Sequence, residues 1–226
     1  MKLSVVCGKK PASKEVQITN VTKEEMKEEF YECICYDGKL YHETYAGTTV
    51  EPEEYIGSVE ETVEAGKIPA KNLCGNEDGV SVGDKVYRLK DDSEAIYIEG
   101  IWPMMDGDTK TKVYQRFALG ANHDNHQEIP RFDSLNEAEH KKLIYYKGKK
   151  YERRDSVDIQ GRNLESIGTL NYASCWENLY ENQELYTTDP FRDVLGYEVF
   201  VDKDNEHRIY LDVEGYFYLY DFVETE

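Results

Sequence analysis

The segment from His123 to His126 is the part of this sequence whose residue types come nearest to a metal site. His123-Asp124-Asn125-His126 sets two histidines three positions apart, so both can share one helical face, and Glu128 follows. Asparagine and aspartate favour turns, however, and a turn in a linker lacks the neighbouring groups that orient metal ligands. We therefore expect no metal at this segment.

A second acidic segment alternates carboxylates like the start of a calcium-binding loop. Its acidic residues are Asp202, Asp204 and Glu206. The segment lacks the central glycine and the distal glutamate that such a loop uses to turn and to complete the coordination. In the internal repeat described below it aligns with residues 89–94, a plain charged loop. We expect a solvated turn here.

The cysteines show no metal-binding or redox pattern. They are Cys7, Cys33, Cys35, Cys74 and Cys175, with no CxxC pair and no histidine at zinc spacing. Cys33 and Cys35 fall two apart on an expected strand and so point to the same face. Because such neighbours rarely meet disulfide geometry, we expect both to be reduced and buried, with no zinc, iron or other cofactor.

Catalytic motifs are missing from the sequence. It has no GxSxG, no phosphate-binding loop and no dinucleotide fingerprint. With 46 acidic residues, a pair of carboxylates carries no information without geometry. None of the five histidines aligns with another histidine in the internal repeat. We expect that the protein is not an enzyme, with a hydrolase site in one repeat as an alternative.

Aromatic residues are the best candidates for contact with a partner. Tyr216, Tyr218 and Tyr220 share one face of the last expected strand, and Phe217 and Leu219 share the other. We expect the Phe/Leu face to be core and the tyrosine face to be half exposed, as in many recognition surfaces. The alternative is that the tyrosines pack against the other repeat.

Trp102 joins this candidate binding set through the internal repeat. It matches Phe217 when Glu99-Gly100 is aligned with Glu214-Gly215. Ligand sites often form between folded units, so we expect contact in the groove between the repeats. The competing interpretation is that Trp102 only holds the repeats together.

The elements that must position these residues come from an internal repeat. Four short blocks recur in the same order at offsets of 110 to 113 residues. They begin at Ile34 and Ile144, at Ile56 and Ile167, at Gly83 and Gly196, and at Ile96 and Ile209. The pattern predicts a tandem duplication in which Gly38 matches Gly148 and Gly57 matches Gly168.

Each repeat is predicted to be mainly β, a small antiparallel barrel or sandwich preceded by a short helix. Capping boxes at Thr22 and Ser134 predict helices over about 23–30 and 135–142. Asp37-Gly38 and Lys147-Gly148 separate alternating runs, as in tight hairpins. The expected division is an N-terminal arm or remnant of a signal region at 1–19, one unit at 20–118, a linker at 119–131, and a second unit at 132–226.

The formal charge of −19 disfavours nucleic acid and anionic membranes as partners. It favours a soluble monomer, although a basic protein partner remains possible. The sequence has no run of 18 apolar residues, so we expect no transmembrane segment. The start, Met1 to Cys7, is similar to the end of a lipoprotein signal but has a short apolar run, so a first strand or loose arm is the alternative.

The first unit has a DGxLY hairpin at 37–41, a glycine-bearing strand at 55–57, an Ile-Pro connector with asparagines at 68–76, and a closing pair at 86–87 and 96–98. In these features it is similar to a module of uncharacterised lipoproteins and secreted proteins of gut and soil Firmicutes. The resemblance covers about residues 34–100 and returns faintly in the second unit, which lacks the connector. It implies an extracytoplasmic address and supplies no activity.

These observations lead to an expected function in binding. The first hypothesis is a non-enzymatic binding or scaffold module of the bacterial cell envelope, whose partner is an unknown protein or envelope ligand. The alternative is a cytoplasmic acidic inhibitor or immunity-type protein that covers a basic partner. The third possibility is the hydrolase noted above.

Overall fold

The computed structural model describes residues 32–77, 79–103, 110–119, 142–174, 179–188 and 194–224. The predicted mainly β class is confirmed, and no α-helix occurs among these residues. No helix within these ranges is therefore long and apolar enough to span a membrane. Predicted helix 23–30, nearly all of predicted helix 135–142 and the histidine segment 123–126 lie outside the described residues.

The strands fall into two groups along the chain, which we call the first half (described residues 32–119) and the second half (described residues 142–224). The strands of the first half are β1 (Cys33–Tyr36), β2 (Lys39–Thr48), β3 (Glu54–Ser58), β4 (Glu61–Val63), β5 (Cys74–Asn76), β6 (Lys85–Arg88), β7 (Ala95–Pro103) and β8 (Lys110–Leu119). Those of the second half are β9 (Leu143–Tyr146), β10 (Lys149–Val157), β11 (Leu164–Thr169), β12 (Tyr172–Ser174), β13 (Leu185–Thr187), β14 (Glu198–Asp202), β15 (Asn205–Val213) and β16 (Tyr216–Val223).

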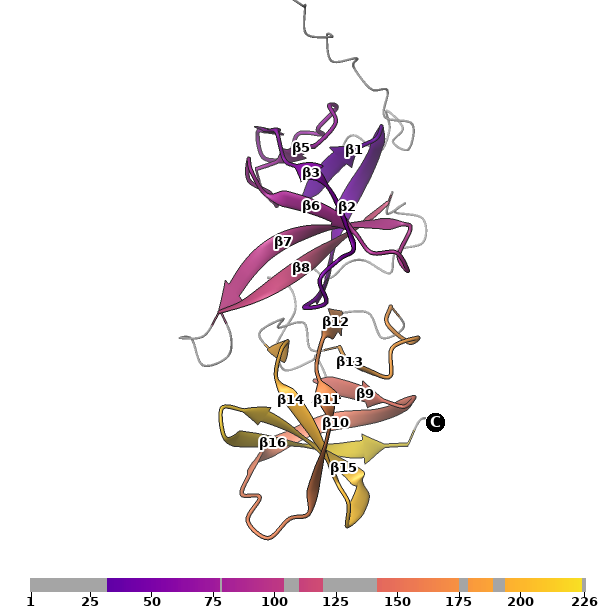
Figure 1. The fold of residues 1–226 in the computed structure, drawn as a ribbon, viewed down its shortest axis with the longest axis vertical. Helices are drawn as coiled ribbons and strands as arrows, with labels where there is room; N and C mark the ends of the chain where they lie inside the picture. Colours follow the sequence, from indigo (N-terminus) through magenta and orange to yellow (C-terminus); the bar gives the residue numbers. More distant parts are fainter. Residues whose placement is uncertain are drawn as a thin grey trace, which may run out of the picture.

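Both halves follow the same scheme of strand pairing. In the first half β1 pairs with β2 and β5, β4 pairs in parallel with β5, and the path β2-β8-β7-β6-β3 completes the sheet. In the second half β9 pairs with β10 and β13, β12 pairs in parallel with β13, and the path β10-β16-β15-β14-β11 completes the sheet. Figure 1 shows the two halves one above the other, each a strongly curved sheet.

The glycines aligned by the sequence occupy equivalent places in this scheme. Gly38 and Gly148 take positive φ angles of 73° and 71° in two-residue turns whose preceding residue also has positive φ. Such turns match the twist of the strands that they join. Gly57 and Gly168 each follow a register shift, opposite Val86 and Val199 respectively.

Each half curls around its own hydrophobic core. The first core contains buried residues of five strands and their connections, among them Ile34, Tyr41, Val86, Ile96 and Phe117. The second core contains Ile144, Tyr151, Val199, Ile209 and Tyr220 at the corresponding strand positions. Burying alternate residues on one face of each strand gives each half a core of its own.

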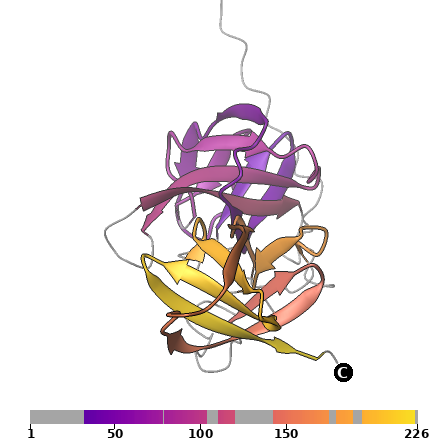
Figure 2. The ribbon, with the colours of Figure 1, turned by 60° about the horizontal axis from the view of Figure 1, so that its bottom comes forward.

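The described strands of both halves form one mixed sheet of 16 strands, where the sequence predicted a small antiparallel barrel or sandwich in each unit. The end of β2 pairs with β12, with Gly47 opposite Ala173. The amide of Thr49 donates to the carbonyl of Asn171 at 3.0 Å. Figure 2 shows β12 reaching from the second half toward the first. The described residues at this junction are therefore packed together.

Candidate ligand-binding site

A cavity of about 480 Å³ opens on the second half, at the end that carries the β9–β10 and β14–β15 turns. This volume lies in the range of small-molecule sites. The cavity lies between these two turns and β11. Its lining residues are Tyr146, Lys147, Lys149, Tyr151, Glu165, Ser166, Ile167, Val201, Asp202, Lys203 and Glu206.

Two tight turns place charged side chains at the rim of the cavity. Lys147 and Gly148, with φ angles of 50° and 71°, form the two-residue turn of the β9–β10 hairpin, and Lys149 begins β10 directly after it. In the β14–β15 hairpin the amide of Asp204 donates to Asp202 Oδ1 at 3.0 Å. This local hydrogen bond holds the turn that presents Lys203 and Glu206.

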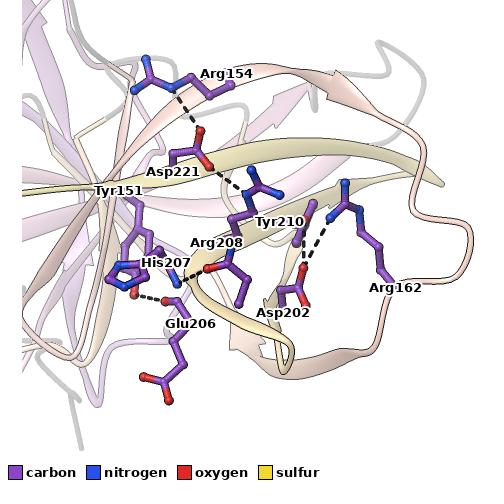
Figure 3. Close-up of polar contacts among 10 residues, drawn as sticks. Tyr151, Arg154, Arg162, Asp202, Glu206, His207, Arg208, Tyr210 and Asp221 are labelled. Atoms are coloured by element: carbon purple, nitrogen blue, oxygen red, sulfur yellow. Dashed lines mark hydrogen bonds and ion pairs between the residues drawn. The ribbon is translucent and has the colours of Figure 1, made fainter.

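Tyrosines from β9 and β10 border the cavity. Tyr151 is almost fully buried, and its hydroxyl donates to the carbonyl of Glu206 at 3.3 Å, as Figure 3 shows. Burial raises the pKa of Tyr151, so the hydroxyl stays protonated at neutral pH. Tyr146 is half-buried, with the ammonium of Lys147 4.8 Å from its ring centre. The cavity therefore has a partly exposed ring, that of Tyr146, beside the buried and hydrogen-bonded Tyr151.

The carboxylate of Asp202 is committed to neighbours within the fold. The Arg162 guanidinium lies 3.4 Å from Asp202 Oδ2, and the Tyr210 hydroxyl donates to the same oxygen at 3.3 Å (Figure 3). Its side chain is only 5% exposed. A carboxylate held in this way fixes the shape of the turn and is poorly placed to take a proton from a ligand.

The charges around the cavity balance one another. Lys203 lies 3.2 Å from Glu165, and Lys147 lies 3.6 Å from Glu184. The hydrogen bond to the Tyr146 hydroxyl, followed by that residue's charge, raises the pKa of Lys147, so it remains a cation at neutral pH. The lining contains three lysines and three carboxylates. The cavity thus presents polar groups of both signs without the net negative charge of the whole chain.

At the equivalent place in the first half an arginine packs on the tyrosine. Strand registers match Arg88 to Val201 and Tyr36 to Tyr146. The Arg88 guanidinium lies over the Tyr36 ring, 5.2 Å from its centre. In the second half the shorter Val201 stands in place of this arginine, and the Tyr146 ring is contacted instead by Lys147 of the adjacent turn.

The glycines that follow the register shifts, Gly57 and Gly168, also differ in their surroundings. A Cβ added at Gly57 would come within 2.6 Å of Leu73 Cδ1, so Leu73 packs closely against the glycine. A Cβ added at Gly168 would meet no atom within 4 Å. Leu185, which the register places where the first half has Leu73, is only half-buried. The second half is therefore less tightly filled at this end.

The tyrosines of the last strand do not line this cavity. Tyr220 is 1% exposed and lies in the second core. Tyr218 packs partly on that core, with the Arg153 guanidinium 4.1 Å from its ring centre, and only Tyr216 is fully open, at 71%. The tyrosine face expected to be half exposed is graded along β16, from the open Tyr216 to the buried Tyr220, because Tyr220 pairs with the buried Ile209 and paired residues share a face.

The expected equivalence of Trp102 and Phe217 is also wrong. Trp102 lies on β7 opposite Thr111, whereas Phe217 lies on β16 opposite Asp212. The Glu-Gly dipeptides that suggested the match occupy different structures: 99–100 lie inside β7, and 214–215 form the β15–β16 turn. Trp102 packs on Val113 of the first half and on Ala173 and Leu195 of the second, so it helps to join the halves.

Sequence reasoning missed the cavity itself. The signal available was the Lys147-Gly148-Lys149 turn, which was interpreted only as a hairpin. No group of three or more histidine, cysteine or acidic side chains in the described ranges is arranged to hold a metal ion. Comparison with protein-family models, curated proteins and solved structures found no match.

Proposed function

We propose that this protein is a non-enzymatic binding module of the bacterial cell envelope that holds a small polar ligand in the cavity of the second half. The observation that carries the proposal is the contrast at equivalent positions: Arg88 lies over Tyr36, whereas Val201 borders a cavity that reaches Tyr146, whose ring is contacted by the exposed Lys147.

The ligand that fits this cavity is close to neutral and rich in hydroxyl groups, as a saccharide is. Balanced lysines and carboxylates attract no polyion of either sign, but they offer donors and acceptors to hydroxyls. The half-buried Tyr146 ring can pack against the apolar face of a sugar ring. Saccharides of the envelope meet both conditions.

A binding role is favoured over catalysis by the state of the polar groups. Asp202 is bonded to Arg162 and Tyr210, and Lys147 is held as a cation. A general base must be free to accept a proton near neutral pH, and neither group meets that requirement. The alternative of a hydrolase site in one half has no comparable support.

We further propose that the halves are tandem copies of one unit, at residues 20–118 and 132–226 with a linker at 119–131. The shared pairing scheme and the matched turn glycines support this interpretation. In this interpretation the first copy keeps a filled end and the second carries the ligand. The similarity of segment 34–100 to secreted Firmicutes modules supports the envelope address.

The test is ligand binding by a pair of matched variants. Val201→Arg copies the first half's arrangement and should cover Tyr146, lowering the affinity for neutral oligosaccharides released from the bacterial envelope by about tenfold or more. Arg88→Val makes the reverse change in the first half and should leave that affinity within about twofold. Isothermal titration calorimetry measures both, with circular dichroism to show that each variant is folded.

Two results would contradict the proposal. One is equal binding by Val201→Arg and the unmodified chain, which would place the ligand elsewhere. The other is cleavage of the oligosaccharide during the titration, which mass spectrometry would detect and which would make the protein an enzyme. Lys149→Ala, at the exposed rim, provides a second variant that cannot disturb the core.

A further inference from the structure

The pairing of β1 with β5 sets two cysteines directly opposite each other. Cys35 of β1 is the register partner of Cys74 of β5, and both side chains are buried. Opposed residues of antiparallel strands project to the same face, with Cα atoms about 4.5–5.5 Å apart. This separation lies inside the range that a disulfide spans, about 4.4–6.8 Å.

The second half uses the same position for another cross-strand contact. Tyr145 of β9 is opposite Tyr186 of β13, and these rings stack with centres 4.6 Å apart and planes 2° apart. The registers of the two halves match Cys35 to Tyr145 and Cys74 to Tyr186. In each half, therefore, a pair of opposed side chains lies between two paired strands: β1 and β5 in the first half, and β9 and β13 in the second.

The third buried cysteine is not an equivalent candidate. Cys33 shares the face of Cys35, but the amide of Cys33 donates to Asn76 Oδ1 at 3.1 Å, so β5 presents an asparagine at that level. Cys33 and Cys35 are neighbours on one strand, where disulfide geometry is rarely met. The register thus singles out one pair of thiols.

We propose that Cys35 and Cys74 form a disulfide bond when the chain folds in an oxidising environment. The three described cysteines are thiols in this structure. With a small disulfide such as oxidised glutathione as oxidant, one protein thiolate displaces a glutathione thiolate and forms a mixed disulfide. The second protein thiolate then displaces the other glutathione, so two protein thiols are oxidised and two glutathione thiols are released.

Reaction in the folded protein should be slow, because the thiolate is the reacting form. Burial, followed by the nearby Cys74, raises the pKa of the Cys35 thiol, and burial, followed by Glu61, raises that of Cys74. Oxidation is therefore expected during folding, before these side chains are covered. The resulting bond would close the long connection from β1 to β5 and restrict the unfolded chain.

The experiment refolds the full chain from urea in a glutathione redox buffer and maps the linked peptides by mass spectrometry. The expected product joins Cys35 to Cys74 and unfolds at a temperature higher by about 5–10 °C than the reduced protein. Cys35→Ser and Cys74→Ser should each abolish the linked peptide and the shift, whereas Cys33→Ser should keep both. Free thiols at both positions after refolding, or a link from either cysteine to a different one, would overturn the proposal.

This outcome is separate from the proposed ligand site, because neither cysteine lines the cavity. A missing disulfide would leave the binding experiments unaffected.

Discussion

The two halves of this molecule share a strand scheme but differ in what covers one end of it. In the first half Arg88 lies over Tyr36, and Leu73 packs against Gly57. In the second half Val201 replaces the arginine, and the space beside Gly168 is open. The comparison teaches that two halves with the same strand scheme can differ in the space at one end when an arginine in one half corresponds to a valine in the other.

A second comparison concerns a tyrosine, an aspartate and an arginine that occur together in both halves. Tyr97 and Tyr210 occupy the same strand position, and each donates to an aspartate of the adjacent hairpin, at 2.6 Å to Asp92 and 3.3 Å to Asp202. The arginines come from different places, Arg116 from β8 and Arg162 from the connection before β11. The aspartate of each half is thus paired with an arginine from a different part of the strand scheme.

The pair in the first half is the tighter one. Arg116 is bidentate, with its Nε 2.6 Å and its Nη2 3.2 Å from Asp92, and the Arg116 side chain is only 10% exposed. Burial, followed by Tyr180 of the second half and by Asp92, raises the pKa of Tyr97 well above its usual range. Because removing one partner would leave a buried charge, this pair should matter more than its counterpart.

The largest expected effect is therefore that of Asp92→Asn. It should lower the free energy of unfolding by about 3 kcal/mol, because Arg116 loses its charge partner in a buried setting. Asp202→Asn is the matched control and should cost about 1 kcal/mol, because Arg162 is more exposed and makes a single, longer contact. Urea unfolding measures both, and equal losses would contradict the comparison.

The same pair should make stability depend on pH in the acid range. Burial tends to raise the pKa of Asp92, but the hydrogen bond and charge of Arg116 outweigh it and hold the pKa below its usual value. A lowered pKa in the folded state gives stability that is present above the unfolded-state pKa, about 3.9, and lost as pH falls through the folded value. Asp92→Asn should flatten this part of the urea-midpoint curve, and an unchanged slope would exclude Asp92 as its source.

The bulge glycines give a smaller and more selective test. Both Gly57 and Gly168 have positive φ, so alanine strains the backbone at either site, by about 1 kcal/mol or more. Gly57→Ala should cost about 1 kcal/mol more than Gly168→Ala, because its Cβ must displace Leu73. Thermal unfolding compares the two variants. A larger loss for Gly168→Ala would show that the second half is the more tightly filled.

The smallest effect is expected at Tyr216. Its side chain is 71% exposed, so Tyr216→Ser should change the free energy of unfolding by less than about 0.5 kcal/mol. It should also leave oligosaccharide affinity unchanged, because the residue does not line the cavity. Loss of binding in this variant would restore the last strand as the contact surface.

The sequence predicted the elements with strong local signals. Asp37-Gly38 and Lys147-Gly148 are two-residue hairpin turns as expected, since a tight turn with positive φ requires few residue types. These features are decided by neighbouring residues, which a single sequence displays.

The remaining features depend on contacts between distant residues. Strands β4, β5, β12 and β13 have three residues each, too few to show a period of two. The faces of β16 could not be assigned because tyrosine suits both core and surface, and its partners on β15 and β10 decide the outcome. Val201 lines the cavity, but its short side chain is informative only in comparison with Arg88, which lies over Tyr36 at the equivalent position.

The most direct test of this account is a ¹H–¹⁵N NMR titration of the full chain with the envelope oligosaccharide. We expect shift changes confined to the cavity segments 146–149, 165–168 and 201–206, with none at the equivalent first-half segments 36–39, 54–57 and 88–93. Changes in the first-half segments, or changes centred on the junction of β2 and β12, would contradict the claim that the second half carries the ligand site.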